Sequence, residues 1–180
     1  MISVRLGDLA EAPETAVLRP VTAEWTATNS TMRRLEVTAG PDVEAQCRSL
    51  GELPVGSAVV TAAGRLACEF LIHVVVRSIE QQVTLPGVQR ALRNGLRRVA
   101  EWGFPTVAMP PLGTGAGNLD AEESAEAMVP ILLEYVRTAE HATRIAILVE
   151  SDYEREAFEG ELRRLAGPGE ADRNHGSESA

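Results

Sequence analysis

Lysine is absent from this 180-residue chain, and all 17 of its basic residues are arginines. A chain without lysine cannot form a Schiff base through a side chain, use a lysine as a general base or contain a Walker A phosphate loop. Aromatic residues make up only 4% of the sequence, so we expect an aliphatic core, for which an apolar content of 44% is sufficient. At this length a single domain is the natural expectation.

Cysteine and histidine are also scarce. The two cysteines, Cys47 and Cys68, are too few for a disulfide framework or a CxxC metal knuckle, and both lie in apolar stretches. We therefore expect both thiols to be buried as small apolar side chains. The three histidines are scattered and show neither HExxH nor H-x-E spacing, so the sequence predicts no metal site.

Positive charge is in the minority, because 17 basic against 26 acidic residues give a formal net charge of 17 − 26 = −9. A chain with no broad positive field is not expected to bind nucleic acids in general or an anionic membrane surface. No apolar run approaches the roughly 20 residues that span a bilayer, and residues 1–9 alternate, unlike the apolar segment of a signal peptide. We therefore predict a cytoplasmic protein.

Apolar patterns of two periods alternate along the chain. Short apolar or alternating runs predict strands at residues 2–6, 16–19, 57–61, 70–76, 105–109 and 143–149. Helical spacing and capping residues predict helices at 41–50, 86–102, 121–136 and 152–165. This order indicates an α/β fold with helices on both faces of the sheet.

Three segments differ from the rest of the chain in their apolar pattern or composition. The nearly unbroken apolar run 70–76 predicts the most buried strand, in which His73 is expected to be a hydrogen-bonded core histidine. Residues 20–40 show no dominant period and remain unassigned. The segment 166–180 consists largely of Gly, Pro, Ser and charged residues, which predicts a disordered tail after a domain of residues 1–165.

A glycine-rich turn carries the clearest chemical signal. Residues 112–117, Leu-Gly-Thr-Gly-Ala-Gly, lie between a predicted strand and a helix capped by Asp120 and Glu123. Alternate glycines let backbone N–H groups converge, and a helix N-terminus adds positive potential, so the turn is suited to a diphosphate. The alternative is that the turn itself needs glycine. A nicotinamide site is disfavoured, because a Rossmann loop follows the first strand and this one follows the second-last.

Several segments occur in an order that matches a known family. They are residues 7–9 (Gly-Asp-Leu), 39–43 (Ala-Gly-Pro-Asp-Val), 56–66, 71–73 (Leu-Ile-His) and 111–117 (Pro-Leu-Gly-Thr-Gly-Ala-Gly). Together they resemble the macrodomains, modules that bind ADP-ribose, over residues 2–165. The resemblance implies a three-layer α/β/α fold with a mixed central sheet, ADP-ribose or an ADP-ribosylated macromolecule as ligand, and no cofactor.

The resemblance also implies roles for individual residues. Asp8 would accept a hydrogen bond from the adenine amino group, although an Asx turn or helix cap is the alternative for this side chain. The turn at 113–117 would surround the diphosphate and distal ribose, and Leu148 or Val149 would replace the family's adenine-packing aromatic residue. The implied ligand-binding residues are Asp8, Leu9, Leu112, Gly113, Thr114, Gly115, Ala116, Gly117, Asn118, Leu148 and Val149. We expect their pocket at the carboxyl ends of the strands, walled also by the loop 20–38 and by residues 148–150.

Two departures from the family pattern bear on catalysis. The Val-Asn-Ala-Ala-Asn segment is expected near residues 19–23, which read Arg-Pro-Val-Thr-Ala, and the first glycine-rich loop, expected near 26–38, has no glycine. Arg33 and Arg34 in that loop are either an alternative phosphate contact or exposed loop charges. The family's hydrolases are expected to position water through the missing groups, so no catalytic residue is predicted.

Three functions therefore remain open. The first is a binding module for ADP-ribose or a related nucleotide diphosphate, without hydrolase activity. The second is a hydrolase of ADP-ribosyl groups or O-acetyl-ADP-ribose, in which Glu24, Asn29 or Glu36 would replace the missing water-positioning group. The third is a degenerate macrodomain that serves as a protein-interaction module. The sequence favours the first.

Overall fold

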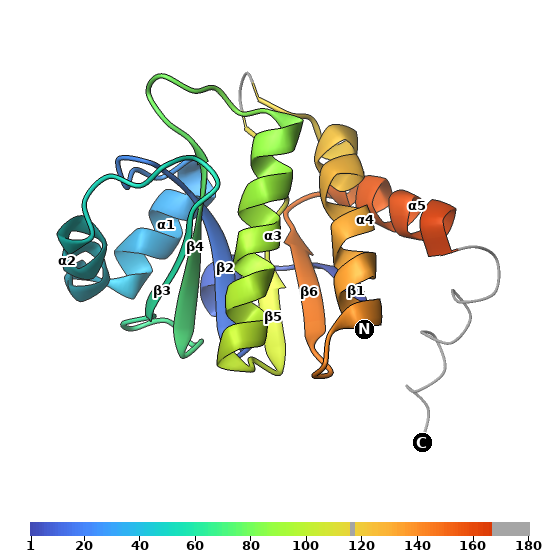
Figure 1. Ribbon diagram of the computed structural model, residues 1–180, viewed down its shortest axis with the longest axis horizontal. Helices are drawn as coiled ribbons and strands as arrows, with labels where there is room; N and C mark the ends of the chain where they lie inside the picture. Colours follow the sequence, from blue (N-terminus) through green and yellow to red (C-terminus); the bar gives the residue numbers. More distant parts are fainter. Residues whose placement is uncertain (116–117, 167–180) are drawn as a thin grey trace.

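A computed structural model describes residues 1–115 and 118–166 of the chain (Figure 1). The strands are β1 (Ile2–Leu6), β2 (Ala16–Thr22), β3 (Ala58–Ala62), β4 (Phe70–Arg77), β5 (Thr106–Met109) and β6 (Arg144–Val149). The helices are the short η1 (Leu9–Glu11), α1 (Ser30–Ala39), α2 (Pro41–Ser49), α3 (Leu85–Trp102), α4 (Ala121–Thr138) and α5 (Asp152–Ala166). Ala116, Gly117 and the predicted tail from residue 167 onward lie outside the described residues.

The six strands form one sheet in the order β1-β6-β5-β2-β4-β3. Every neighbouring pair is parallel except β3 and β4, which are antiparallel, so the sheet is mixed as expected. A parallel pair requires a crossover connection, and helices supply these crossovers over both faces of the sheet. The carboxyl ends of the parallel strands consequently share one edge, at the top of Figure 1.

Side-chain alternation along β2 shows how the layers are held together. Leu18 points into the larger core, which α3 and α4 cover and to which Phe158 of α5 contributes. Val17 points to the other face, where it packs with Met32 and Leu35 of α1 and with apolar residues of α2. Figure 1 shows α3 and α4 lying across one face of the sheet, with α1 and α2 behind it. The three-layer α/β/α fold is therefore confirmed.

The predicted strands and helices are confirmed with shifts of a few residues at their ends, but the prediction for the most buried strand was wrong. All residues of β2 are buried, whereas β4 is only partly buried at both ends. The reason is position in the sheet, because β2 lies between β5 and β4 and is covered by helices on both faces. His73 in β4 is fully buried, as predicted.

The treatment of residues 26–38 as a loop was also wrong, because residues 30–39 form helix α1. Asn29 caps this helix, since its Oδ1 accepts a hydrogen bond from Met32 N at 2.9 Å. Met32, Leu35 and Ala39 then follow at helical spacing and are buried against the sheet. This cap and apolar stripe were the sequence signal that was missed.

Helix α4 runs without a break through Pro130. No helix in the described part of the chain is long and apolar enough to cross a membrane.

Candidate ligand-binding site

The sheet edge where the parallel strands end brings together segments that are distant in sequence. Asp8 follows β1, residues 23–29 follow β2, the glycine turn follows β5, and Glu150 follows β6. The β5 turn lies beside the segment before α1, because a Cβ built on Gly115 would be 4.0 Å from Thr28 O. In open parallel sheets, this edge is where ligands bind.

Asp8 is engaged within the protein through both carboxylate oxygens. Its Oδ1 accepts a hydrogen bond from Ala10 N at 2.9 Å and caps η1, while Oδ2 lies 3.3 Å from Nε of Arg34. The same arginine contacts Glu150 Oε1 at 3.3 Å, and Thr31 donates to that oxygen at 2.7 Å. Helix α1 is thereby tied to the ends of β1 and β6. Arg34 is thus a helix residue in an ion-pair cluster, not a loop charge.

Two glycines shape the turn after β5 in different ways. Gly113 has φ +78°, and a Cβ there would come within 2.7 Å of Val88 Cγ2, so glycine is needed for packing as well as for conformation. Gly115 has φ +128° and is exposed, and the nearest atom to its Cβ position is Asn118 Nδ2 at 3.5 Å. Gly115 is therefore an exposed part of the turn, with ordinary contact distances to Asn118 and to Thr28 O.

The other described residues of this turn are less available for contacts with a ligand, because they form hydrogen bonds within the protein. Leu112 is fully buried, and its backbone is bonded to α4 through Met128 Sδ at 3.1 Å and Ser124 Oγ at 2.8 Å. Thr114 Oγ1 donates to Pro111 O at 3.4 Å, and Asn118 N donates to Gly115 O at 3.1 Å. Leu112 shapes the turn from inside. Thr114 and Asn118 remain partly exposed at the edge.

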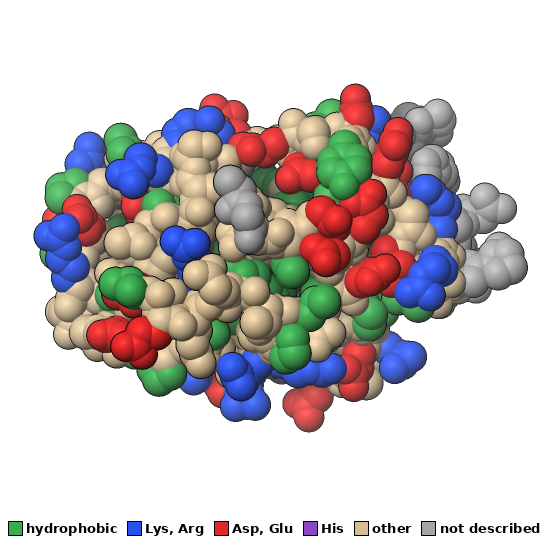
Figure 2. Space-filling model, turned by 90° about the horizontal axis from the view of Figure 1, so that it is seen from above, with side chains coloured by type: hydrophobic (Ala, Val, Ile, Leu, Met, Phe, Trp, Pro, Cys, Tyr) green, Lys and Arg blue, Asp and Glu red, His purple; other side chains and the backbone are tan. Residues whose placement is uncertain are grey.

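The sequence predicts that the N-terminus of α4 adds positive potential to the glycine turn, but acidic side chains around this helix end reduce that potential. Asp120 and Glu123 form a complete capping box, with Glu123 N donating to Asp120 Oδ1 at 2.8 Å. Figure 2 shows acidic side chains gathered over the α4 and α5 end of this edge. The acidic residues at these two helix starts are Asp120, Glu122, Glu123, Glu150, Asp152 and Glu154. The hydrogen bond from Tyr153 to Glu122 raises the pKa of Tyr153 to about 12 and joins the two helices. The carboxylates offset the helix field, so an anion here depends on the β5 turn.

Of the apolar residues expected to contact adenine, Leu9 and Leu148 share one face of the sheet and Val149 does not. Leu9 and Leu148 are almost fully buried under α1, and Val149 is fully buried on the other face of the sheet. A Cβ on Gly7 would be 3.6 Å from Leu148 Cδ2, so the side chain of Leu148 lies directly beneath the turn that carries Asp8.

The segment after β2 holds a bulky residue in a left-handed conformation. Trp25 has φ +64°, which is rare for a large side chain. The turn is closed by Trp25 N donating to Thr22 O at 3.0 Å and by the hydroxyls of Thr22 and Thr26, 2.7 Å apart. Glu24 accepts a hydrogen bond from Ile79 N at 3.0 Å, which lowers the pKa of Glu24.

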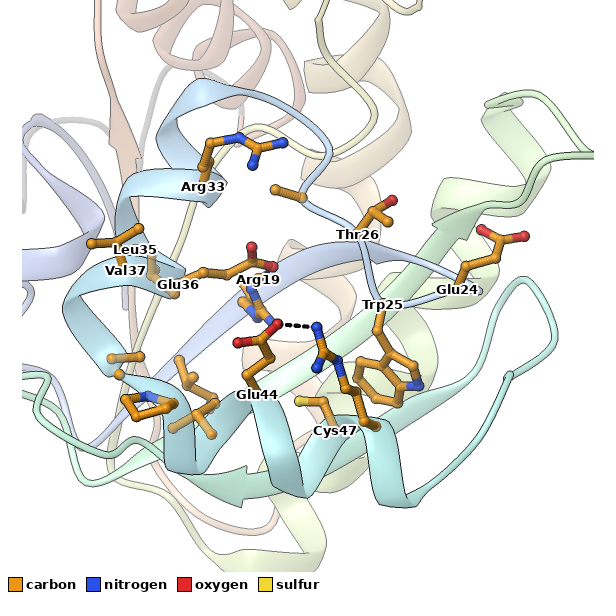
Figure 3. Close-up of a pocket in the computed structure, with 17 residues that line it drawn as sticks. Arg19, Glu24, Trp25, Thr26, Arg33, Leu35, Glu36, Val37, Glu44 and Cys47 are labelled. Atoms are coloured by element: carbon orange, nitrogen blue, oxygen red, sulfur yellow. Dashed lines mark hydrogen bonds and ion pairs between the residues drawn. The ribbon is translucent and has the colours of Figure 1, made fainter.

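A cavity of about 510 Å³ lies between α1, α2 and residues 24–27, and Figure 3 shows its lining. Arg33, Glu36 and Val37 line it from α1, whereas Arg34 faces the Asp8 cluster on the opposite side of that helix. Neither Asp8 nor the described part of the β5 turn lines this cavity. The cavity therefore shares residues 24–27 with the carboxyl edge but lies on the other side of α1 from Asp8.

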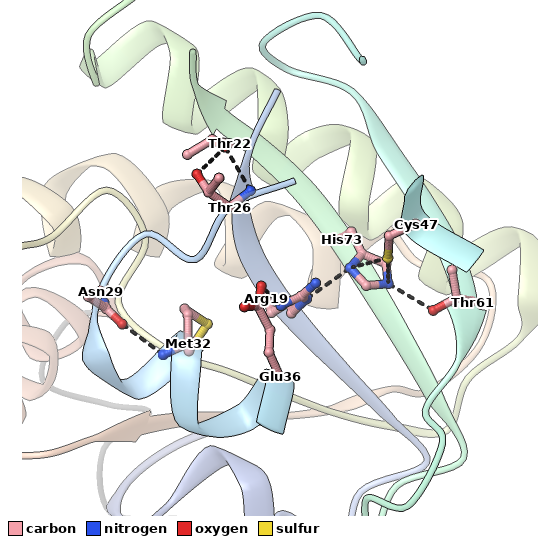
Figure 4. Close-up of polar contacts among 9 residues, drawn as sticks. All are labelled: Arg19, Thr22, Thr26, Asn29, Met32, Glu36, Cys47, Thr61 and His73. Carbon is pink, nitrogen blue, oxygen red and sulfur yellow. Dashed lines mark hydrogen bonds and ion pairs between the residues drawn. The ribbon is translucent and has the colours of Figure 1, made fainter. Parts of the chain in front are cut away.

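Figure 4 shows a buried polar cluster, of which Arg19 and Glu36 also line this cavity. Arg19 donates from Nε to His73 Nδ1 at 2.9 Å and from Nη1 to Glu36 Oε1 at 2.8 Å. His73 Nε2 lies 2.8 Å from Thr61 Oγ1, and Thr61 in turn donates to Ala62 O. Nε2 must therefore carry the proton of a neutral imidazole. Burial, and secondly the charge of Arg19, hold the pKa of His73 well below its usual value.

Both cysteines are buried and free, as predicted. Cys47 Sγ lies 3.8 Å from His73 Nε2, but both imidazole nitrogens have nearer partners, so His73 is not a base for this thiol. Burial raises the pKa of Cys47 and raises the pKa of Cys68 to about 11. Neither thiol has the environment of a nucleophile.

Comparison with known proteins identifies the class of protein that this fold and edge define. The family model described as "Macro domain" matches residues 28–128, more than half of the chain. The chain belongs to the Macro domain family.

Individual relatives agree with that assignment. The chain is 29% identical over 126 residues to an uncharacterized protein of Aeropyrum pernix, covering 69% of this chain and 67% of that one. It is 31% identical over 104 residues to the O-acetyl-ADP-ribose deacetylase of Enterobacter cloacae, covering 54% and 58% of the two chains. The Oceanobacillus iheyensis macrodomain with ADP has the same fold, with a TM-score of 0.82 at 17% identity and coverage of 91% and 90%.

Proposed function

We propose that this chain binds ADP-ribose, free or attached to a macromolecule, at the carboxyl edge of the sheet and does not hydrolyse it. The observation that carries the proposal is the turn after β5 in a Macro domain fold. There Gly113 and Gly115 both have left-handed backbone, and Gly115 is exposed beside the segment before α1. Such a turn presents backbone N–H groups to a phosphate without side-chain obstruction.

Residues at the ends of β1 and β6 would provide the contacts to adenine. The carboxylate of Asp8 is about one-third exposed and suits the amino group of adenine, and Leu148 provides an apolar surface beneath it. Arg34 competes for Asp8 and at the same time brings a positive charge to an edge that is otherwise acidic. The ligand would therefore replace an existing contact at Asp8.

The surroundings of five residues support binding without turnover. Asn29 is occupied as the cap of α1, Glu24 accepts the Ile79 N–H group, and Glu36 is paired with Arg19. Pro20 lies within β2, and the Thr22 hydroxyl is bonded to Thr26. These side chains are already engaged in the fold, which disfavours a role in positioning a water molecule beside the distal ribose, and loss of such positioning costs orders of magnitude in rate.

Binding is tested by calorimetry and thermal unfolding with ADP-ribose. Ligand at 100 times its Kd is expected to stabilise the protein by about 2.7 kcal/mol. We expect Gly115→Glu to abolish binding, because it places a bulky carboxylate where the diphosphate would lie. Gly103→Glu is the matched control, since Gly103 also has positive φ and open surroundings but caps α3 at the opposite edge of the sheet. Wild-type affinity in Gly115→Glu would contradict the assignment of the turn.

A second function, hydrolysis, is favoured by the name of the Enterobacter cloacae relative. Single-turnover assays with O-acetyl-ADP-ribose and with an ADP-ribosylated protein distinguish it from binding alone. We expect no release above the uncatalysed rate. Release would reject the binding-only proposal, and Glu24→Gln, Asn29→Ala and Glu36→Gln would then identify the responsible group.

A further inference from the structure

A buried hydroxyl without a hydrogen-bond partner lies beside the turn after β5. Among the described residues, three buried side-chain atoms have no partner, namely Oε2 of Glu14, Oγ1 of Thr28 and Nε of Arg77. Buried polar atoms in folded proteins are nearly always hydrogen-bonded, so each exception needs an explanation. Thr28 is the one whose place suggests a ligand, because its backbone oxygen lies 4.0 Å from the position that a Cβ on Gly115 would take.

The segment that carries Thr28 is held on both sides. An antiparallel bridge between Val21 and Ala27 folds the chain back along the end of β2, and Asn29 caps α1 directly after Thr28. Thr28 itself is partly exposed at the carboxyl edge. Rotation about its χ1 bond between staggered rotamers therefore turns the hydroxyl from its buried position toward a ligand at this edge.

The order of the strands decides which part of a ligand reaches Thr28. Asp8 follows β1, and the glycine turn follows β5, two strands farther along the sheet. Thr28 belongs to the segment after β2, which is the next strand in the same direction. Neighbouring strands lie about 4.8 Å apart. An extended ligand with its adenine at Asp8 and its diphosphate at the turn consequently places its second ribose at Thr28.

We propose that Thr28 recognises the distal ribose of ADP-ribose, through a hydrogen bond between its hydroxyl and a ribose hydroxyl. This assignment rests on the proposed function, which supplies the positions of the adenine and the diphosphate. A threonine hydroxyl both donates and accepts, so it pairs with a ribose hydroxyl in either sense. A site that hydrogen-bonds a ligand hydroxyl discriminates against a ligand that lacks it. Thr28 therefore makes the site select ADP-ribose over ADP.

Calorimetry with ADP-ribose and ADP tests the contact. Thr28→Val removes the hydroxyl and keeps the shape of the side chain. We expect it to weaken ADP-ribose binding about five- to tenfold, as the loss of one hydrogen bond does. Affinity for ADP, which has no second ribose, should stay within about twofold of the wild-type value. Thr28→Ser keeps the hydroxyl and should bind ADP-ribose as the wild type does.

Denaturant unfolding separates recognition from a structural role. The Thr28 hydroxyl has no partner in the free protein, so Thr28→Val should leave the unfolding midpoint unchanged or raise it. Thr26→Val is the matched control in the same segment, because the hydroxyl of Thr26 lies 2.7 Å from that of Thr22. This control should lower the midpoint and leave ADP-ribose affinity unchanged.

The possible outcomes separate the Thr28 contact from the proposed function. No binding of ADP-ribose by the wild-type chain would refute the proposed function, and the contact with it. Wild-type affinity in Thr28→Val, when the wild type itself binds, would refute the contact alone. An equal loss of affinity for ADP and ADP-ribose would place the hydroxyl at the diphosphate, and a lowered midpoint in Thr28→Val would show that the fold uses it. Either result would overturn the assignment.

Discussion

At the scale of single residues, the most constrained side chain is His73. Its two ring nitrogens are used by Arg19 and Thr61, and its ring is fully buried in β4. Arg19 donates to Nδ1 and its positive charge disfavours a second cation beside it, so the imidazole has to stay neutral for both contacts to persist. His73 therefore orients Arg19 and is not a proton donor or acceptor in a reaction.

This environment predicts a specific loss of stability in mild acid. The pKa of His73 is low in the folded state, while in the unfolded chain it returns to about 6.5. Below that pH the unfolded state binds a proton that the folded state does not. The free energy of unfolding should therefore fall as pH drops below about 6.5, by up to about 1.4 kcal/mol per pH unit from this group.

Denaturant unfolding between about pH 7 and pH 5.5 measures this slope, in the range where histidines titrate. His73→Gln keeps a neutral side chain and should flatten the slope, even if it lowers stability at every pH. His141→Gln is the control, because His141 is exposed and outside the cluster. An unchanged slope in His73→Gln would show that His73 is not the titrating group.

At the scale of elements, α3 shows why a glycine sits inside a long helix. Gly95 faces the sheet, and a Cβ there would lie 2.6 Å from Leu18 Cδ1 and 2.9 Å from Val74 Cγ1. Both neighbours are fully buried, so neither can move easily. The glycine lets α3 approach β2 and β4 closely.

We predict that replacing glycine by alanine lowers the free energy of unfolding in α3 and raises it in α5. Gly95→Ala gains about 1 kcal/mol of helix propensity but should destabilise the protein overall, because overpacking costs about 1–3 kcal/mol. Gly160→Ala in α5 should stabilise by up to about 1 kcal/mol, since the nearest atom to its Cβ position is 4.0 Å away, at Arg163 Nη2. Denaturant unfolding measures the change in the free energy of unfolding for both variants. Stabilisation by Gly95→Ala would mean that the α3–sheet contact is looser than described.

At the scale of the whole molecule, Arg34 joins three elements at the ligand edge through Asp8 and Glu150. Its side chain is about half exposed, so each ion pair contributes at most about 1 kcal/mol. On the proposed function, Arg34→Ala releases Asp8 for the adenine amino group, and ADP-ribose should bind up to about fivefold more tightly.

Calorimetry of Arg34→Ala and Arg33→Ala tests this competition. Arg33 is the adjacent arginine, but it lines the cavity on the other side of α1 from Asp8, so its removal should leave ADP-ribose affinity unchanged. Weaker binding in Arg34→Ala would instead place its guanidinium on the diphosphate.

The overall charge of the molecule leads to one more prediction. With a net charge of −9 and acidic side chains gathered at one end of the ligand edge, the protein carries a net field that repels phosphate backbones. We expect no binding of duplex DNA in a gel-shift assay at about 50 mM salt, where such contacts are strongest. A shifted band that disappears with salt would reveal a basic surface.

The sequence by itself determined the order of the strands and of every helix from α2 to α5, the cap of α4, and the glycine turn after β5. These features depend on period, capping and turn residues within short windows. Helix α1 could have been predicted in the same way, from the Asn29 cap and the apolar stripe of Met32, Leu35 and Ala39. It was missed because the family pattern suggested a loop there.

Only the tertiary structure decided which charged residues meet. Arg19 reaches His73 and Glu36 because β2 pairs with β4 under α1, and Arg34 reaches Asp8 because α1 crosses the end of β1. The greater burial of β2 and the position of the cavity likewise follow from strand order and from which side of α1 each residue faces. Residues far apart in sequence carry no local signal of such pairings, since these depend on how the layers pack.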